Sequence, residues 1–292
     1  MSKGVVYVAS GTSYVRKAAT SAESLRIYNP DLPITLFTDE SVESPAFDEI
    51  VNVDVDIAEK GDSILSRDHM RYDKTLFLDA DTFVAADISD VFTALDRFDI
   101  VAAHNEARAW YHQEIYQQAG VDVPECFPEY NSGVVGYNNS RKVRRLFDRL
   151  NETYTDLDYE RNQPAFRIAL YESDLNIGTL PPEYNFMTHT IGFASGEVKI
   201  LHQGASDENL ADWAARLNDI EGKKVTTWEA HPCRVVPNSY KSRKYWLQAA
   251  DWDSVESLFE DAREKQRRDG TLSLLSAGVR RIKRFAVNDE TS

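Results

Sequence analysis

The chain has 292 residues, 42% hydrophobic and 11% aromatic, so it can bury a large core, and one α/β domain with additions is favoured over two equal domains. Its net charge of −15 argues against nucleic acid or an anionic membrane as the main partner. The two cysteines lie far apart in sequence, and the chain has neither a signal peptide nor an apolar run long enough to span a membrane. We therefore expect a cytoplasmic protein.

The beginning of the chain has a strand–helix–strand pattern that is typical of nucleotide-binding sheets. Residues 4–9 and 33–38 are predicted strands, and residues 15–28 between them form a predicted amphipathic helix. The first turn, residues 10–14, contains neither the fingerprint G-x-G-x-x-G nor a P-loop. Its backbone and the Tyr14 ring are suited to hold a nucleoside, and packing of Tyr14 on the helix is the alternative.

A short central strand is the main functional signal in the sequence. Residues 50–57 alternate like a half-buried strand, residues 58–70 form a predicted helix, and residues 74–78 form a strand that is apolar on both faces. Asp79 and Asp81 follow this strand two residues apart, so both project from its carboxyl end, where α/β sheets bind ligands. Such close like charges favour a divalent cation with oxygen ligands; the alternative is a simple turn or helix cap.

The second half of the chain adds a possible nitrogen ligand. Helices are predicted at residues 88–95, 105–122, 141–154 and 162–170, and strands at residues 99–104 and 130–138, with an extended stretch at 177–185. The last predicted strand, residues 198–201, ends in His202, whose imidazole fits a metal that Asp79 and Asp81 share.

The character of the sequence changes near residue 222, where a polar, helical tail begins. We therefore predict a main domain over residues 1–222 and a helical extension over residues 223–292. Residues 272–285 combine apolar and basic side chains, so they suit either peripheral contact with the inner face of a membrane or docking onto the acidic body of the protein.

Seven segments in a fixed order resemble family 8 of the glycosyltransferases, the glycogenin and lipopolysaccharide galactosyltransferase group. They are VYVASGTSY, LFTDE, YDKTLFLDADT, YNSGVVGYN, NQPAF, LPPEYN and ILHQG, and the resemblance covers residues 5–206. It implies the GT-A fold, an α/β fold with a mixed, mostly parallel central sheet flanked by helices. It also implies a metal-dependent, retaining transferase that moves a hexose from a nucleotide-diphosphate sugar, a UDP-sugar by preference, to a hydroxyl acceptor.

The resemblance also implies the site residues. Asp79, Asp81 and His202 would hold Mn²⁺ or Mg²⁺, with Asn131 and Asn162 beside the donor sugar. Since no protein nucleophile stands out, Gln163 would lend oxygen density to front-face attack by the acceptor hydroxyl. The predicted nucleotide- and donor-binding residues are Ala9, Ser10, Gly11, Thr12, Tyr14, Asp39, Lys60, Asp79, Ala80, Ser132, Gly133 and Gly204.

Two departures from the family pattern concern charge. Asn162 stands where the family carries an aspartate, and residues 205–208 lack the lysine that members often have there. The diphosphate clamp is then incomplete unless Lys60, Arg67 or Lys199 substitutes. Lys60 is preferred, because the start of the predicted helix 58–70 returns to the carboxylate end of the central strand.

Two other functions stay open at this point. A nucleotidyltransferase has a similar sheet, but it would need a loop rich in glycine and basic residues after the first strand, and ASGTSY has one glycine and no cation. A protein that kept the fold and binds a nucleotide sugar with weak catalysis agrees with the two departures.

Overall fold

The structure is a computed structural model that describes residues 1–53, 65–105, 115–116, 119–157, 162–187, 193–194, 196–202, 210–218, 225–227 and 235–237. These residues all belong to one unit, Met1–Pro237. Apart from residues 225–227 and 235–237, the predicted extension lies outside the described residues, so the boundary at residue 222 and the role of residues 272–285 stay predictions. Within the described part of the chain, no helix is long and apolar enough to cross a membrane.

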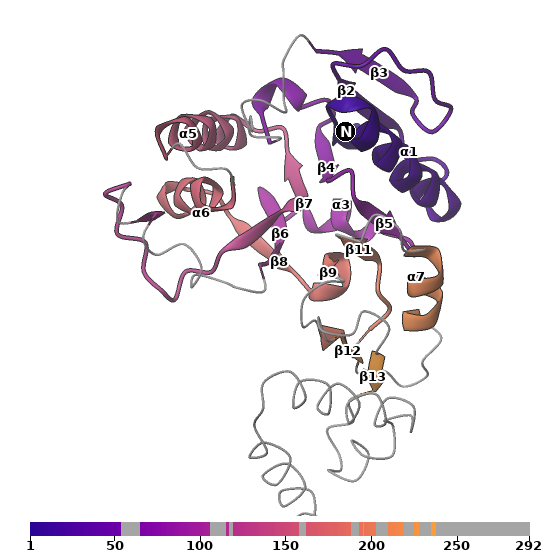
Figure 1. The fold of residues 1–292 in the computed structure, drawn as a ribbon. Coiled ribbons are helices and arrows are strands. Elements are labelled where there is room, and N and C mark those ends of the chain that lie inside the picture. Colours follow the sequence, from indigo (N-terminus) through magenta and orange to yellow (C-terminus); the bar gives the residue numbers. More distant parts are fainter. Residues whose placement is uncertain are drawn as a thin grey trace, which may run out of the picture. The chain divides into compact units, whose positions relative to one another are not determined.

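A seven-stranded sheet, in the order β3-β2-β1-β4-β7-β6-β8, forms the centre of the described structure (Figure 1). Its strands are β1 (Lys3–Val8), β2 (Ile34–Thr38), β3 (Glu49–Asn52), β4 (Lys74–Leu78), β6 (Ile100–His104), β7 (Tyr130–Asn138) and β8 (Ile177–Leu180). Neighbouring strands are parallel, except that β7 runs antiparallel to both β4 and β6. The predicted mixed, mostly parallel sheet is therefore confirmed.

Helices cover both faces of this sheet, because successive side chains of its central strands point to opposite faces. On β1, Val5 and Tyr7 belong to one buried cluster, and Val6 and Val8 belong to another. The helices are α1 (Gly11–Tyr28) and α3 (Asp90–Ala94) on the first face, and α5 (Arg141–Leu157) and α6 (Gln163–Glu172) on the second. The two apolar faces explain why the central strands read as continuous hydrophobic runs.

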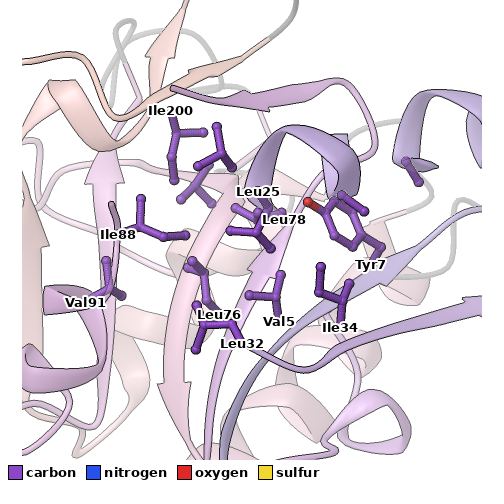
Figure 2. Close-up of a cluster of buried hydrophobic side chains, with 14 of the residues drawn as sticks. Val5, Tyr7, Leu25, Leu32, Ile34, Leu76, Leu78, Ile88, Val91 and Ile200 are labelled. Atoms are coloured by element: carbon purple, nitrogen blue, oxygen red, sulfur yellow. The ribbon is translucent and has the colours of Figure 1, made fainter. Parts of the chain in front are cut away.

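The cluster under α1 fixes that helix against the carboxyl half of the sheet (Figure 2). Leu25 of α1 packs with Leu76 and Leu78 of β4, and all three are fully buried. Ile88 and Ile200, which lie far apart in the sequence, join the same cluster. This packing places α1 beside the strand that ends in the two aspartates.

A second, three-stranded sheet, in the order β5-β11-β9, positions His202. Its strands are β5 (Thr82–Val84), β11 (Ile200–His202) and β9 (Phe186–Met187). The antiparallel register between β11 and β5 pairs His202 with Thr82, the residue after Asp81. The sequence prediction missed β5, because three residues are too few to show a periodic pattern.

Smaller elements complete the described residues. They are the single-turn helices η1 (Arg67–His69) and η2 (Pro182–Tyr184), helix α7 (Leu210–Asn218), and a sheet of β10 (Phe193–Ala194), β12 (Val225–Thr227) and β13 (Val235–Pro237).

Two predicted helices differ from the observed elements. The predicted helix 58–70 is wrong over its described end: a single 3-10 turn starts there after Ser66, whose hydroxyl accepts the N–H of Asp68. The predicted helix 88–95 is reduced to α3, which spans five residues.

Candidate metal and donor site

Asp79, Asp81 and His202 meet at the carboxyl end of β4. The Nε2 atom of His202 lies 3.4 Å from Asp79 Oδ2 and 3.4 Å from Asp81 Oδ1. One ligand atom from each residue fits within a 4.8 Å group. The expectation that two carboxylates and a distant imidazole converge is therefore confirmed, and we call these three residues the Asp-Asp-His group. That the group binds a metal stays a prediction.

The turn between β4 and β5 presents the two carboxylates on the same side. The N–H of Asp79 donates to the Gly133 carbonyl at 2.8 Å, which extends the pairing of β4 with β7 by one residue. The Asp79 carbonyl then accepts both the N–H and the hydroxyl of Thr82, at 3.2 and 2.8 Å. These bonds close a tight turn, so Asp79 and Asp81 keep a fixed separation.

Asn185 fixes the orientation of the buried imidazole. The Nδ1–H of His202 donates to Asn185 Oδ1 at 2.7 Å, which directs Nε2 at the carboxylates. Burial alone would lower the pKa of His202, but Asp79 and Asp81 raise it to about 9. Burial also opposes ionisation of Asp81, yet His202 and the charge of Lys17 hold the pKa of Asp81 below its usual value. A cation, either a proton on His202 or a metal ion, is therefore favoured between the two carboxylates.

Gly133 on β7 leaves the space that such a cation needs. A Cβ atom built on this residue would lie 2.2 Å from His202 Cε1 and 2.4 Å from Asp79 Oδ2. Any side chain at this position would therefore displace two of the three candidate ligands. The residue types of the Asp-Asp-His group and the open backbone beside it fit a divalent ion with oxygen and nitrogen ligands.

The predicted sugar-side residues lie where β7 begins and α6 begins. The Ser132 hydroxyl donates to Asn162 Oδ1 at 2.9 Å, and Gln163, the first residue of α6, is partly exposed. Asn131 is 5% exposed: its Oδ1 accepts the Gly133 N–H, and its Nδ2 contacts the Met187 sulfur at 3.9 Å. The Asn131 side chain thus supports the backbone at Gly133, and the catalytic role predicted for it stays a prediction.

The predicted nucleoside-side residues lie at the start of α1. Asp39, at the end of β2, accepts the Ser10 hydroxyl at 2.5 Å and the Gly11 N–H at 3.3 Å. Gly11 has a φ of +76°, which glycine adopts without strain. Tyr14 is 57% exposed, and the Lys17 ammonium lies 5.3 Å from the centre of its ring. This exposure contradicts packing of Tyr14 into the core.

Other predicted donor-site residues follow the same elements. Ala9 and Ala80 are buried next to the turns that end β1 and β4, and Thr12 is exposed in the first turn of α1. Lys60 and Gly204 lie outside the described residues, so their roles stay predictions.

The two described cations that the sequence offered for a diphosphate are engaged in ion pairs. Arg67 pairs with Asp148 at 3.1 Å, and Lys199 pairs with Glu197 at 2.8 Å.

No protein-family model and no curated protein sequence matches the chain. Two solved structures resemble it. The galactosyltransferase LgtC, in complex with donor and acceptor sugar analogues, is 18% identical with a TM-score of 0.51 over 73% of this chain and 93% of LgtC. An active-site mutant of LgtC is 15% identical with a TM-score of 0.53 over 73% and 94%. The chain has the GT-A glycosyltransferase fold. At these identities the likeness establishes the fold and leaves the activity to be argued from the site.

Sequence reasoning missed two residues of this site. Asn185 was visible only as part of LPPEYN, and nothing in that segment indicates that it meets His202. Lys17 lies one helical turn after Tyr14, and that spacing was a usable signal for a cation beside the predicted nucleoside pocket.

Proposed function

We propose that the protein is a metal-dependent glycosyltransferase of the family 8 type, which moves a hexose from a UDP-sugar to a hydroxyl acceptor with retention of configuration. The observation that supports this most is the Asp-Asp-His group at the carboxyl end of β4 in a chain with the GT-A fold. Two carboxylates and an imidazole suit Mn²⁺ better than Mg²⁺, because Mg²⁺ prefers oxygen ligands and retains its waters.

In this proposal, a bound divalent ion would supply positive charge to the donor diphosphate and to the departing nucleotide. The protein's part is to hold the ligands still. Asn185 keeps His202 Nε2 directed inwards, the bonds between Thr82 and Asp79 fix the carboxylate turn, and Gly133 leaves the centre open. Because these contacts exist without a ligand, little reorganisation is needed when the donor binds.

The residues assigned to the donor sugar carry amides. We assign to Gln163 the oxygen that stabilises the cation-like anomeric carbon during front-face attack. Asn162 Oδ1 is held by the Ser132 hydroxyl, so its position is also fixed. An amide oxygen carries less negative charge than the carboxylate that the family resemblance places at residue 162, so we expect slow hydrolysis of the donor when no acceptor is present.

A screen of nucleotide sugars tests this proposal. Purified protein is incubated with a panel of UDP- and GDP-sugars and Mn²⁺, and release of the nucleoside diphosphate is scored by mass spectrometry. We expect release from at least one UDP-sugar, loss of release with chelator, and loss in Asp81→Ala. Asp96→Ala, which removes a surface partner of Lys74, is the control and should retain activity. Release at full rate in Asp81→Ala would falsify the assignment.

A nucleotide-sugar-binding protein with weak catalysis is the second candidate. It is favoured by Asn162, whose side chain is neutral and already bonded to Ser132. Metal-dependent binding of UDP without turnover of any sugar or acceptor tested would support this candidate over the transferase.

A further inference from the structure

Helix α1 is fastened to the carboxylate turn by a chain of hydroxyl groups. The Tyr7 hydroxyl lies 2.9 Å from Ser21 Oγ, and Ser21 Oγ lies 2.8 Å from Thr82 Oγ1. One turn further along the helix, Ser24 Oγ accepts the N–H of Val84. All of these groups are buried, so they hold one face of α1 against the residues that directly follow Asp81 (Figure 1).

Lys17 extends from this same face of α1. Residues four apart lie one above the other on a helix, so Lys17 sits one turn before Ser21, toward the start of the helix. Its charge acts on Asp81, as the lowered pKa of that carboxyl records. Its ammonium also lies over the exposed ring of Tyr14, at 5.3 Å from the ring centre. Lys17 therefore stands between the Asp-Asp-His group and Tyr14.

Lys17 differs from the other cations considered for this site. Lys74 pairs with Asp96 at 2.6 Å, and Arg67 and Lys199 have carboxylate partners of their own. Among the described residues, no carboxylate lies within ion-pair distance of Lys17. A partly buried ammonium beside a cluster of acids, with no direct ion pair, is available to an anionic ligand.

Charge makes such a residue necessary. The chain carries −15, and both Asp79 and Asp81 repel an approaching diphosphate. A nucleoside diphosphate has a flat base at one end and phosphates at the other. An exposed aromatic ring followed by an ammonium and then by a candidate metal site matches that order of groups.

We propose that Lys17 is a specificity-determining residue of the donor site, whose ammonium pairs with a phosphate oxygen of the nucleoside diphosphate between a base stacked on Tyr14 and the Asp-Asp-His group. This inference rests on the proposed function and supplies the cation that the sequence lacks at residues 205–208.

Calorimetric titration tests the inference in the full chain with Mn²⁺ present. The probes are UDP, and uridine measured at millimolar concentration by ligand-observed NMR; GDP and guanosine replace them if the wild-type protein binds GDP instead. We expect Lys17→Met to weaken UDP binding by about 10- to 100-fold, as for loss of a charged hydrogen bond, and to leave uridine binding unchanged. Lys17→Arg keeps the charge and should retain most of the UDP affinity.

Arg16→Met is the matched control, because it removes a neighbouring positive charge from the same helix at an exposed position. It should bind UDP and uridine like the wild-type protein, and both methionine variants should bind Mn²⁺ alone as the wild-type does. Unchanged UDP affinity in Lys17→Met overturns the inference and leaves the proposed function standing. Equal weakening of UDP and uridine overturns it too, since Lys17 would then only order Tyr14. A wild-type protein that binds neither UDP nor GDP overturns both.

Discussion

Gly133 and His202 are in such close contact that a Cβ atom on the glycine would lie 2.2 Å from the imidazole Cε1. This is closer than any real Cβ contact, and the neighbours are two candidate ligands rather than a flexible side-chain end. The Asp-Asp-His group therefore depends on a strand residue that contributes no side chain.

Gly133→Ala should abolish Mn²⁺ binding, because the added methyl group pushes His202 and Asp79 apart. Titration of free Mn²⁺ by electron paramagnetic resonance measures the loss, and thermal unfolding monitors the fold. Ser132→Ala is the control: it changes the adjacent residue and removes the bond to Asn162, but it should leave Mn²⁺ affinity unchanged. Mn²⁺ affinity in Gly133→Ala equal to that of the wild-type would refute the metal assignment.

Asn185 should control metal affinity without touching the metal. Asn185→Leu removes the acceptor of the His202 Nδ1–H, so we expect Mn²⁺ affinity to fall by about 10- to 100-fold. Asn185→Asp keeps an acceptor oxygen at the same position and should bind Mn²⁺ at least as tightly as the wild-type. If the two variants bind Mn²⁺ equally, Asn185 does not orient the imidazole.

Arg167 should contribute strongly to stability. It is 1% exposed, donates to the carbonyls of Phe127 and Pro124, and stacks on Tyr116, whose hydroxyl donates to the buried Glu129. Arg167→Met leaves those carbonyls without donors, so the free energy of unfolding should fall by about 2–4 kcal/mol.

Urea unfolding of Arg167→Met and of the exposed control Arg144→Met measures this difference. We expect the control to change stability by less than about 1 kcal/mol. Similar stabilities of the two variants would mean that the Arg167 network adds little. Because Arg167 lies in α6, we also expect its loss to loosen the segment that begins with Asn162 and Gln163.

Asp48 should make part of the stability dependent on pH. Partial burial opposes its ionisation, but the Arg26 guanidinium at 2.6 Å and the Ile34 N–H at 2.7 Å outweigh this and lower its pKa below 3.8. A carboxyl group with a lowered pKa stabilises the fold above its unfolded value, and this stabilisation is lost as the pH falls through the folded value.

Asp48→Asn should therefore cost about 0.5–1 kcal/mol at pH 7, a small effect because the pair is half exposed, and almost nothing at pH 3. Urea unfolding of both proteins at the two pH values measures this. The same stability difference at pH 7 and pH 3 would contradict the assigned ion pair.

Local patterns predicted much of this architecture. The strands over residues 4–9, 33–38, 74–78 and 130–138 follow from apolar runs bounded by turns, and the observed β7 has the predicted bounds. The spacing of Asp79 and Asp81 predicted their common side, because side chains two apart on an extended chain point the same way. Local spacing did not predict β5, which is three residues long, or the 3-10 turn at Arg67–His69, where the Ser66 side chain competes with the helix.

The sequence by itself determined the sheet, the pair of carboxylates at the end of β4 and the histidine at the end of the last predicted strand. Only the tertiary structure decided that His202 faces the carboxylates, that Asn185 orients it, that Gly133 leaves the space open and that Lys17 stands beside Asp81. The physical reason is range. A strand or helix pattern is set by neighbours in the chain, whereas His202 and Asp81 lie 121 residues apart and meet only because β11 pairs with β5 in one register.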